Sequence, residues 1–370
     1  DMRARARAYV QAFRSRTARF EVIYASKAFP CTAVYRLFAD EGLSVDVASG
    51  GELHLALAGG VDPARIYLHG NNKSPAELDY AIESGVGCIV VDSFDEIERL
   101  RGRAARVMVR VTPGIKPSTH SYIQTGQEDS KFGFGLDDVP RAVRACADAG
   151  LELRGLHAHI GSQIFELEPY KLAIRALGEL AGDWCRLLNV GGGLGIAYTA
   201  EDEPPSIDAY VEVKVRGVAE VFEHSPRILV EPGRSLVGNA GVTAYGIGTV
   251  KEIPGVRTYV AVDGGMSDNL RPMLYGARYD AEIADRFGHG THCHLVGKHC
   301  ESGDVIIQAA DLDDPQPGDV VVTPATGAYG HAMANNYNAI PRPPVIICRD
   351  GHARVAVRRE TYDDLTLRDR

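Results

Sequence analysis

The sequence has 370 residues, 45% of them hydrophobic and 24% charged, which is typical of a globular protein with more than one domain. The net charge of −9 argues against a nucleic-acid or other polyanionic partner. No apolar run reaches the roughly 18 residues of a membrane-spanning helix, and no signal peptide is visible. The seven cysteines are scattered and odd in number, so we expect reduced thiols and a cytoplasmic protein.

The first twenty residues contain six arginines and few acids, a composition also found in organellar transit peptides. However, Ala8, Ala12 and Phe13 have helical spacing, and the segment runs directly into a strand-like sequence. We therefore interpret it as a basic amphipathic helix of the mature fold.

Short apolar, strand-like runs then alternate with helical patterns. Residues 22–25 form the first run, which is followed by Lys27, Pro30 and a helical pattern at 32–41. The further strands are expected at 43–47, 65–68, 88–91, around 108–109, and at 156–160, 187–190 and 228–230. The further helices are expected at 51–57, from 74 onward, and at 93–100, 139–149, 169–180 and about 207–222. Ser74 with Glu77, and Ser93 with Glu96, have the spacing of a helix capping box. A long loop is expected to end near residue 136.

Eight strands alternating with helices over roughly 210 residues predict a parallel (β/α)8 barrel, for which a doubly wound sheet is the competitor. From about residue 238, strand-like runs at 242–245, 257–262, 319–323, 345–348 and 354–357 are separated by Gly and Pro, which predicts a second, all-β domain. We expect the two domains to comprise residues 1–235 and 236–370.

A barrel enzyme carries its chemistry at the carboxyl ends of the strands. Polar or glycine residues indeed follow seven of the expected strands, namely Lys27, Asp46, His69 with Asn71, Asp92, His157 with His159, Gly191 to Gly193, and Glu231. A lysine at a strand end is by itself often only a snorkelling side chain, but this series of strand ends favours an active site.

Three motifs carry specific chemistry. Gly191 to Gly195 resembles a dinucleotide fingerprint but no helix follows it directly, so a phosphate cradle is favoured and a tight turn remains the alternative. The sequence from Glu231 to Arg234 offers a carboxylate for a cationic ring nitrogen and a guanidinium for an anion, or a structural ion pair. His157 and His159 point to the same side of their strand, where one could stack on a planar ligand while Ser162 donates to a phosphate; a core histidine is the alternative for either.

Histidines and cysteines also cluster between residues 289 and 300, but their spacings match no regular zinc pattern. We therefore expect no metal.

A lysine amine, a phosphate cradle, a stacking imidazole and a carboxylate together describe a pyridoxal 5'-phosphate site.

The chain resembles the diaminopimelate decarboxylases, fold-type III pyridoxal phosphate enzymes related to ornithine decarboxylase and, more distantly, to alanine racemase. The resemblance extends over nearly the whole chain, although the short strand that usually precedes the basic helix in the family is absent from this sequence. Its motifs are 24–27 (YASK), 49–53 (SGGEL), 69–73 (HGNNK), 159–163 (HIGSQ), 191–193 (GGG), 231–234 (EPGR), 263–266 (DGGM), Arg271-Pro272 with Tyr275-Gly276, 297–304 (GKHCESGD) and 327–330 (GAYG).

The resemblance implies roles for individual residues toward the cofactor. Lys27 holds it as a Schiff base, His159 stacks on its ring, and Glu231 faces the pyridine nitrogen. A carboxylate there keeps the ring protonated and favours decarboxylation, whereas the related racemase has an arginine. The remaining cofactor-binding residues implied are Asp46, Ser162, Gly191, Gly192, Gly193, Gly233, Arg234 and Tyr329.

The resemblance also implies that Cys300 donates the proton after CO2 leaves and arrives from the partner subunit of a homodimer. For the substrate, Glu301 would bind the distal amine of diaminopimelate and Arg271 its distal carboxylate, together with Arg234, Tyr275 and Tyr329. Two alternatives remain open. One is a related decarboxylase of lysine, ornithine, arginine or a secondary metabolite, and the other is a non-catalytic cofactor carrier or inactive regulator of the same fold.

Overall fold

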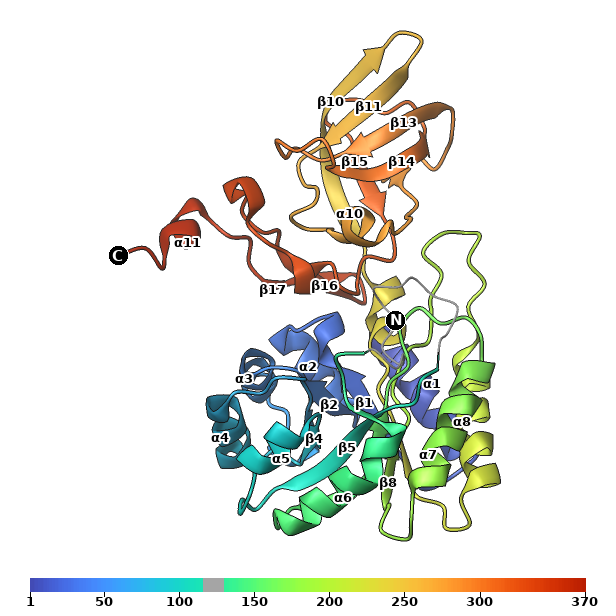
Figure 1. Ribbon diagram of the computed structural model, residues 1–370. Coiled ribbons are helices and arrows are strands. Elements are labelled where there is room, and N and C mark those ends of the chain that lie inside the picture. Colours follow the sequence, from blue (N-terminus) through green and yellow to red (C-terminus); the bar gives the residue numbers. More distant parts are fainter. Residues whose placement is uncertain (116–129) are drawn as a thin grey trace. The chain divides into compact units, whose positions relative to one another are not determined.

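A computed structural model describes residues 1–115 and 130–370 of the chain (Figure 1). The chain divides into two compact units, which we describe separately. The first consists of residues 1–196 and 203–236, and the second of residues 197–202 and 237–370.

The first unit is a closed parallel barrel. Among the described residues, eight strands pair in the order β1, β2, β3, β4, β5, β7, β8 and β9, and β9 pairs with β1 to close the ring. Their bounds are β1 (Phe20–Ala25), β2 (Ser44–Val47), β3 (Ile66–Leu68), β4 (Cys88–Val91), β5 (Arg106–Thr112), β7 (Glu152–Ala158), β8 (Leu187–Asn189) and β9 (Arg227–Val230), with β6 (Phe134–Gly135) paired to β5. The predicted barrel is confirmed, and all eight strands lie where the sequence places them to within a few residues.

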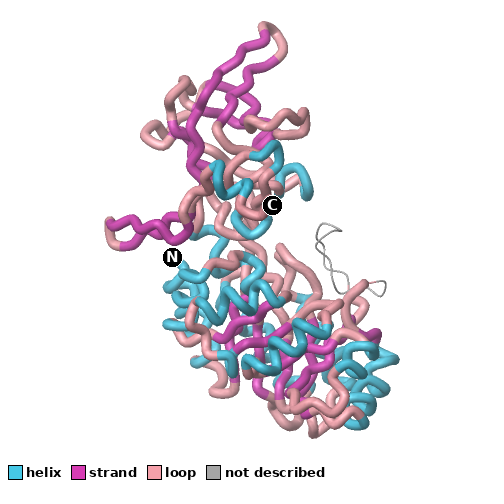
Figure 2. The backbone as a smooth tube through the Cα atoms, turned by 90° about the vertical axis from the view of Figure 1, so that its left-hand side faces the viewer, coloured by secondary structure: helices cyan, strands magenta, loops and turns pink. Residues whose placement is uncertain are grey.

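Helices surround these strands, which lie at the centre of the first unit (Figure 2). After the N-terminal helix α1 (Met2–Arg14) they are α2 (Thr32–Asp40), α3 (Gly50–Ala58), α4 (Pro75–Ser84), α5 (Phe94–Arg99), α6 (Val139–Asp148), α7 (Glu168–Leu180) and α8 (Ile207–Val221). The strands of a closed, helix-covered parallel sheet are buried on both faces, and β2, β3 and β4 are buried at every residue. The expected loop before residue 136 lies largely outside the described residues.

Capping residues begin two of the helices as expected. Ser74 and Glu77 form a complete capping box at α4. At α5, Ser93 accepts a hydrogen bond from the Glu96 N–H, but the Glu96 carboxylate does not return to Ser93. It binds Lys73 and the Asp92 N–H instead, so the second box is only half formed.

Helix α1 belongs to the barrel unit, as the sequence predicts. Its buried face includes Tyr9 and Phe13, and the Tyr9 hydroxyl lies 2.7 Å from Oγ of Ser235. On its polar face Arg3 and Arg7 both pair with Glu41 at 2.7 Å, which explains part of the arginine content.

The second unit is built on an antiparallel-rich sheet, which confirms the predicted β domain. Its six strands follow the order β12, β15, β10, β11, β13, β14, and a separate hairpin pairs β16 with β17. The bounds are β10 (Thr243–Ile253), β11 (Arg257–Val262), β12 (Glu282–Ile283), β13 (Thr291–Val296), β14 (Val305–Leu312), β15 (Val320–Thr323), β16 (Val345–Arg349) and β17 (His352–Val357), with short helices α10 (Arg271–Tyr275) and α11 (Tyr362–Thr366). The single-turn helix α9 (Arg234–Val237) spans the point in the sequence where the first unit ends. Strands β12, β13 and β14 are not predicted from the sequence. No helix in the described ranges is long and apolar enough to cross a membrane.

Candidate active site

The residues that follow β1 and β2 place an amine beside a buried carboxylate. Lys27 lies in the single turn Ser26–Ala28 and is exposed between two buried neighbours. Asp46 is the next-to-last residue of β2 and accepts a hydrogen bond from the Ser26 N–H at 3.3 Å. Burial and the charge of Glu231 raise the pKa of Asp46 well above its ordinary value, while the nearby Lys27 opposes the shift. The first turn after β1 therefore brings Lys27 to the carboxyl end of the barrel.

Glu231, directly after β9, is held by side chains from three other strand ends. Its Oε1 accepts a hydrogen bond from Asn189 Nδ2 at 2.6 Å, and its Oε2 lies 2.9 Å from Nε2 of His157. Nε2 of His69 lies 2.9 Å from Oε1 but is not aligned for a hydrogen bond. Four elements of the barrel thus converge on one buried carboxylate.

The electrostatics of this cluster favour an anion held by neutral imidazoles. Burial lowers the pKa of His157 to about 4 and lowers that of His69, although the charge of Glu231 opposes both shifts. Burial alone would raise the pKa of Glu231, but the adjacent His69 and His157 hold it well below its ordinary value. Neutral His157 then carries its proton on Nε2, which donates to the carboxylate.

The glycines after β8 allow a very close approach of the backbone. A Cβ at Gly192 would lie 2.1 Å from the main-chain oxygen of Glu231, and one at Gly193 would lie 2.7 Å from that of Gly161. Gly191 and Gly193 also have φ values of 62° and 102°, which favour glycine. The expected Gly-rich turn is therefore required sterically at three successive positions.

His159 and Ser162 lie against this loop and the turn after β9. The Gly192 N–H donates to Nδ1 of His159 at 3.2 Å, which leaves the imidazole proton on Nε2. Burial lowers the pKa of His159 well below its ordinary value, and the charge of Lys27 adds to this. Arg234 donates to Oγ of Ser162 at 2.9 Å. A neutral imidazole, a hydroxyl and a guanidinium thus lie beside the glycine loop.

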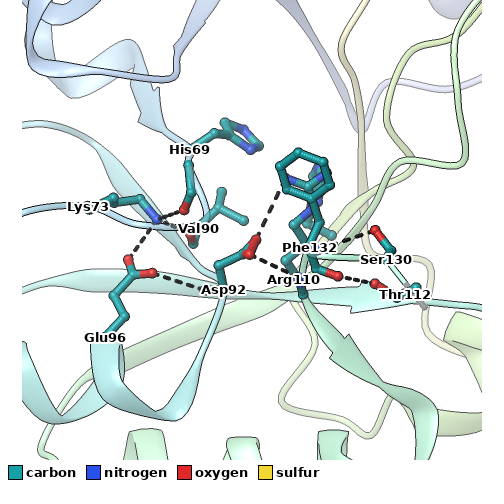
Figure 3. Close-up of polar contacts among 12 residues, drawn as sticks. His69, Lys73, Val90, Asp92, Glu96, Arg110, Thr112, Ser130 and Phe132 are labelled. Carbon is teal, nitrogen blue, oxygen red and sulfur yellow. Dashed lines mark hydrogen bonds and ion pairs between the residues drawn. The ribbon is translucent and has the colours of Figure 1, made fainter. Parts of the chain in front are cut away.

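A buried ion pair supports the loop that carries His69 (Figure 3). Nζ of Lys73 lies 2.7 Å from Oε1 of Glu96 and also donates to the main-chain oxygens of Gly70 and Val90, each at 2.8 Å. Both charged side chains are 2% exposed. Burial lowers the pKa of Lys73 and raises that of Glu96, and each partner opposes the shift of the other. The pair fixes the turn that follows His69 against β4.

Next to this pair, Asp92 and Arg110 fix the segment that enters β6 (Figure 3). Oδ2 of Asp92 accepts a hydrogen bond from the Gly133 N–H at 2.9 Å, and its Oδ1 lies 3.7 Å from Arg110. The Arg110 guanidinium lies 4.3 Å from the centre of the Phe132 ring, in a cation–π contact. Asp92, expected only as a polar strand end, therefore has a structural role.

In the second unit, Arg271 is enclosed by aromatic rings. Its guanidinium lies 4.4 Å from the ring centre of Tyr198 and 5.5 Å from that of Tyr279, and it donates to the Tyr279 hydroxyl. Arg271 is 6% exposed. Tyr275 lies one turn away at the end of α10. This packing fixes the cation in one orientation.

The loop with Cys300 and Glu301 also belongs to the second unit. Cys300 is exposed, and its N–H donates to Oδ1 of Asn338 at 2.8 Å. Oε2 of Glu301 lies 3.5 Å from the Tyr337 hydroxyl. The same unit contains Tyr329, whose φ of 63° is in the left-handed region. The implied cofactor residues other than Tyr329 thus belong to the barrel unit, and the implied substrate residues other than Arg234 belong to the second.

The histidines and cysteines at 289–300 do not form a metal-like group in the described part of the chain. Strand β13 instead separates them, since Cys293 faces the core and His292 and His294 alternate with it. The one group of three potential ligands found among the described residues is His69, His157 and Glu231, whose ligand atoms lie within 4.8 Å of one another. These are the residues that hold the buried anion.

Comparisons with known proteins place the chain in a family. Residues 1–238 match the model of the pyridoxal-binding domain of pyridoxal-dependent decarboxylases. The diaminopimelate decarboxylase of Bacillus subtilis (strain 168) is 47% identical, with 100% of this chain and 89% of its relative covered. That of Mycobacterium tuberculosis (strain CDC 1551 / Oshkosh) is 43% identical, with 99% and 88% covered. The crystal structure of the Helicobacter pylori enzyme complexed with L-lysine matches with a TM-score of 0.92 and 31% identity over 99% of this chain and 93% of its own.

The chain belongs to the diaminopimelate decarboxylase family. It is a pyridoxal phosphate-dependent decarboxylase, and the residues present suit that cofactor. Among the described residues, Oε2 of Glu231 accepts a hydrogen bond from His157 alone, so it can also accept one from a protonated ring nitrogen. The steric need for glycine at 191–193 arises from the protein's own backbone, which packs this loop directly against Ala158, Gly161 and Glu231.

Several residues of this decarboxylase site are not singled out from the sequence. Asn189 lies two residues before Gly191, which could have marked it as a ligand of the loop or of Glu231. Lys73 ends the HGNNK motif, yet a lysine before a helix is ordinarily solvated. The alternation of side chains along β7 places His157 on the inner side of the barrel. Predicting its contact with Glu231, however, requires the order of the strands.

Breaking the buried Lys73–Glu96 ion pair should strongly destabilise the barrel. Replacing Lys73 with methionine leaves the Glu96 carboxylate buried without its cation, which typically costs about 3 to 5 kcal/mol. Urea unfolding of the purified variant measures this loss. Lys171→Met, which removes a lysine 3.6 Å from Glu168 on the exposed face of α7, is the matched control and should lose far less. Equal losses of unfolding free energy in the two variants would contradict a stabilising role for the buried Lys73–Glu96 pair.

Proposed function

We propose that this enzyme decarboxylates meso-2,6-diaminopimelate to L-lysine and CO2, the last step of lysine biosynthesis. The observation that carries the proposal is the full-length identity of 42–47% to curated diaminopimelate decarboxylases. A structural neighbour from Helicobacter pylori is complexed with L-lysine, the product expected of this reaction. We further propose that residues 1–235 bind the cofactor and residues 236–370 supply substrate-side groups.

Bound pyridoxal phosphate supplies an electron sink for the pair that CO2 leaves behind. Lys27 binds the cofactor covalently, and the Glu231 anion holds a proton at its ring nitrogen. His159 provides a flat neutral platform whose orientation is fixed by the Gly192 N–H. The loop 191–193, Ser162 and Arg234 bind the phosphate, with Asp46, Gly233 and Tyr329 completing the cofactor set. The thiol of Cys300 then delivers a proton to the α-carbon.

Substrate choice depends on the charges at the far end of the pocket. Diaminopimelate has an amine and a carboxylate there, so Glu301 would bind the amine and Arg271 the carboxylate. The enclosure of Arg271 by Tyr198 and Tyr279 supports this role, because a pre-oriented guanidinium loses little freedom on binding an anion. Arg234, Tyr275 and Tyr329 are the other proposed substrate ligands.

The alternative is a decarboxylase for lysine, ornithine or arginine. The lysine/ornithine decarboxylase of Vibrio vulnificus matches with a TM-score of 0.81 but 24% identity, which reflects the fold alone. Those substrates have no distal carboxylate for Arg271 to bind. The fixed arginine therefore favours diaminopimelate.

We also propose a homodimer in which each site receives Cys300 and Glu301 from the partner subunit. Support comes from the family resemblance and from the exposure of the Cys300 thiol in the single chain.

Replacing Arg271 with glutamine should change substrate preference. We expect kcat/KM for meso-diaminopimelate to fall by roughly two to three orders of magnitude, since truncating one partner of a buried charge pair costs about 2 to 5 kcal/mol. Any slight activity on lysine, ornithine or arginine should stay unchanged or rise. Steady-state assays on all four substrates, side by side, provide the measurement.

Arg278→Gln is the matched control, because Arg278 is an exposed arginine of the same unit that pairs with Glu201 at 2.9 Å. It should keep the preference of the parent enzyme. If Arg271→Gln lost activity equally on every substrate, with its cofactor absorbance intact, Arg271 would not be the reader of the distal carboxylate.

Mixing two inactive variants should restore activity if sites are shared. Lys27→Ala should lose the visible absorbance of covalently bound cofactor and all turnover, whereas Cys300→Ala should bind cofactor but turn over roughly 10²- to 10⁴-fold more slowly. Random re-pairing should restore about a quarter of the parental activity, because half of the dimers are hybrids and each hybrid keeps one intact site. No recovery, with subunit exchange verified by mass spectrometry, would rule out sharing through Cys300.

A further inference from the structure

Lys214 is a fully buried lysine in the middle of α8. It has no exposed surface, and no carboxylate lies within ion-pair distance of it in the described ranges. Nζ of Lys214 donates to the main-chain oxygen of Val190 at 2.7 Å and to that of Gly191 at 3.0 Å. Burial of an amine without a carboxylate partner is costly, whereas an apolar side chain would fill the same volume without that cost. The position therefore calls for a role beyond packing.

Two tyrosines complete the surroundings of this amine. Nζ of Lys214 lies 4.7 Å from the ring centre of Tyr170 and 4.2 Å from that of Tyr210. The two rings meet edge to face at 5.1 Å, and the Tyr210 hydroxyl also donates to the Gly191 oxygen at 3.2 Å. Burial lowers the pKa of Lys214 well below its ordinary value, against the opposing charge of Glu231. Even a neutral amine keeps two N–H donors, which is the number that the two carbonyls require.

The two carbonyls belong to successive peptide planes of the glycine loop. In a planar trans peptide the C=O and the N–H point in opposite directions. The amine that holds the Val190 oxygen therefore also orients the Gly191 N–H, which donates to Oδ1 of Asn189 at 3.0 Å. In the same way, holding the Gly191 oxygen orients the Gly192 N–H toward Nδ1 of His159.

One of these N–H groups holds Asn189, which in turn holds Glu231, and the other holds His159. Asn189 uses its other end to donate to Oε1 of Glu231 at 2.6 Å, and His159 is the proposed stacking platform. We infer that Lys214 is a positioning residue for the cofactor ring, which orients Glu231 through Asn189 and orients the His159 imidazole through Gly192. The inference rests on the proposed roles of Glu231 and His159, and it goes beyond them by giving Lys214 a share in their alignment. Lys214 alone among these donors holds the Val190 oxygen, whereas the Gly191 oxygen also accepts from the Glu231 N–H at 3.0 Å and from Tyr210.

The test compares cofactor binding in Lys214→Met and in the parent enzyme. Methionine has a similar length and no donor, so it keeps the packing and removes both hydrogen bonds. Titration of each cofactor-free, full-length protein with pyridoxal phosphate, and separately with pyridoxal, gives the Kd. Visible circular dichroism at saturation reports how the ring is held in its asymmetric surroundings.

We expect the Kd to rise about tenfold for both ligands, a factor that corresponds to about 1.4 kcal/mol, the scale of one to two net hydrogen bonds. The visible dichroism should also change in sign or strength. Lys214→Gln, which retains two N–H donors on a shorter chain, should recover part of both signals. It also serves as the second variant if the methionine form does not fold. Lys171→Met on the exposed face of α7 is the control and should behave as the parent.

Three results would overturn the inference. An unchanged Kd and dichroism would show that the ring is held without Lys214. Weaker binding of pyridoxal phosphate with unchanged binding of pyridoxal would assign Lys214 to phosphate binding. A loss of affinity with unchanged dichroism, matched by an equal loss in the free energy of unfolding of the cofactor-free protein, would make its role purely structural. Because no substrate is present, these outcomes are independent of the diaminopimelate assignment.

Discussion

The burial of the Glu231 carboxylate is the constraint on which the barrel site depends. An isolated anion in that position would be strongly destabilising, so the fold must supply donors from several directions. Asn189 and His157 supply them from β8 and β7, and the imidazole of His69 lies 2.9 Å from the carboxylate at the end of β3. Burial lowers the pKa of both imidazoles, and neutral His157 stabilises the carboxylate through its N–H. The anion thus remains available to hold a proton on a ring nitrogen.

Two of these residues, His69 and Asn189, are themselves supported by a second layer of buried polar contacts. The turn after His69 is fixed by Lys73 and Glu96, and Asn189 is fixed through the peptide planes that Lys214 orients. Both lysines donate to main-chain oxygens of a loop, Lys73 to Gly70 and Lys214 to Val190 and Gly191, and Lys73 also donates to Val90 in β4. A buried amine behind a loop therefore compensates for irregular backbone that lacks regular hydrogen bonds. This arrangement explains why charged residues occur so deep in the molecule.

The sequence predicts much of the barrel because local patterns determine its elements. Apolar runs such as Cys88–Val91 and caps such as Ser74 give each strand and helix within a few residues. Motif residues at strand ends also predict Lys27, Glu231 and His159 as site residues, and the structure places all three at the carboxyl ends of barrel strands. Strands β12 to β14 escape prediction: β12 has two residues, and the alternation of His and Cys in β13 draws attention to metal ligands instead. Lys214 could not be found this way, since helical spacing alone does not distinguish a buried lysine from a solvated one at the edge of an apolar face.

The second unit also contains a buried charged side chain that holds a loop through hydrogen bonds. Asp304 is almost fully buried and accepts hydrogen bonds from Nδ1 and the main-chain N–H of His299, at 2.6 and 3.0 Å, and from the Met266 N–H at 2.7 Å. A side chain at Gly297 would collide with this carboxylate, since its Cβ would lie 2.1 Å from it. The loop that carries Cys300 is therefore held at its base by a buried acid, as the loop of His69 is held by a buried lysine. In each unit a buried charged side chain four residues along the chain, Lys73 after His69 and Asp304 after Cys300, holds the main chain of the loop through hydrogen bonds.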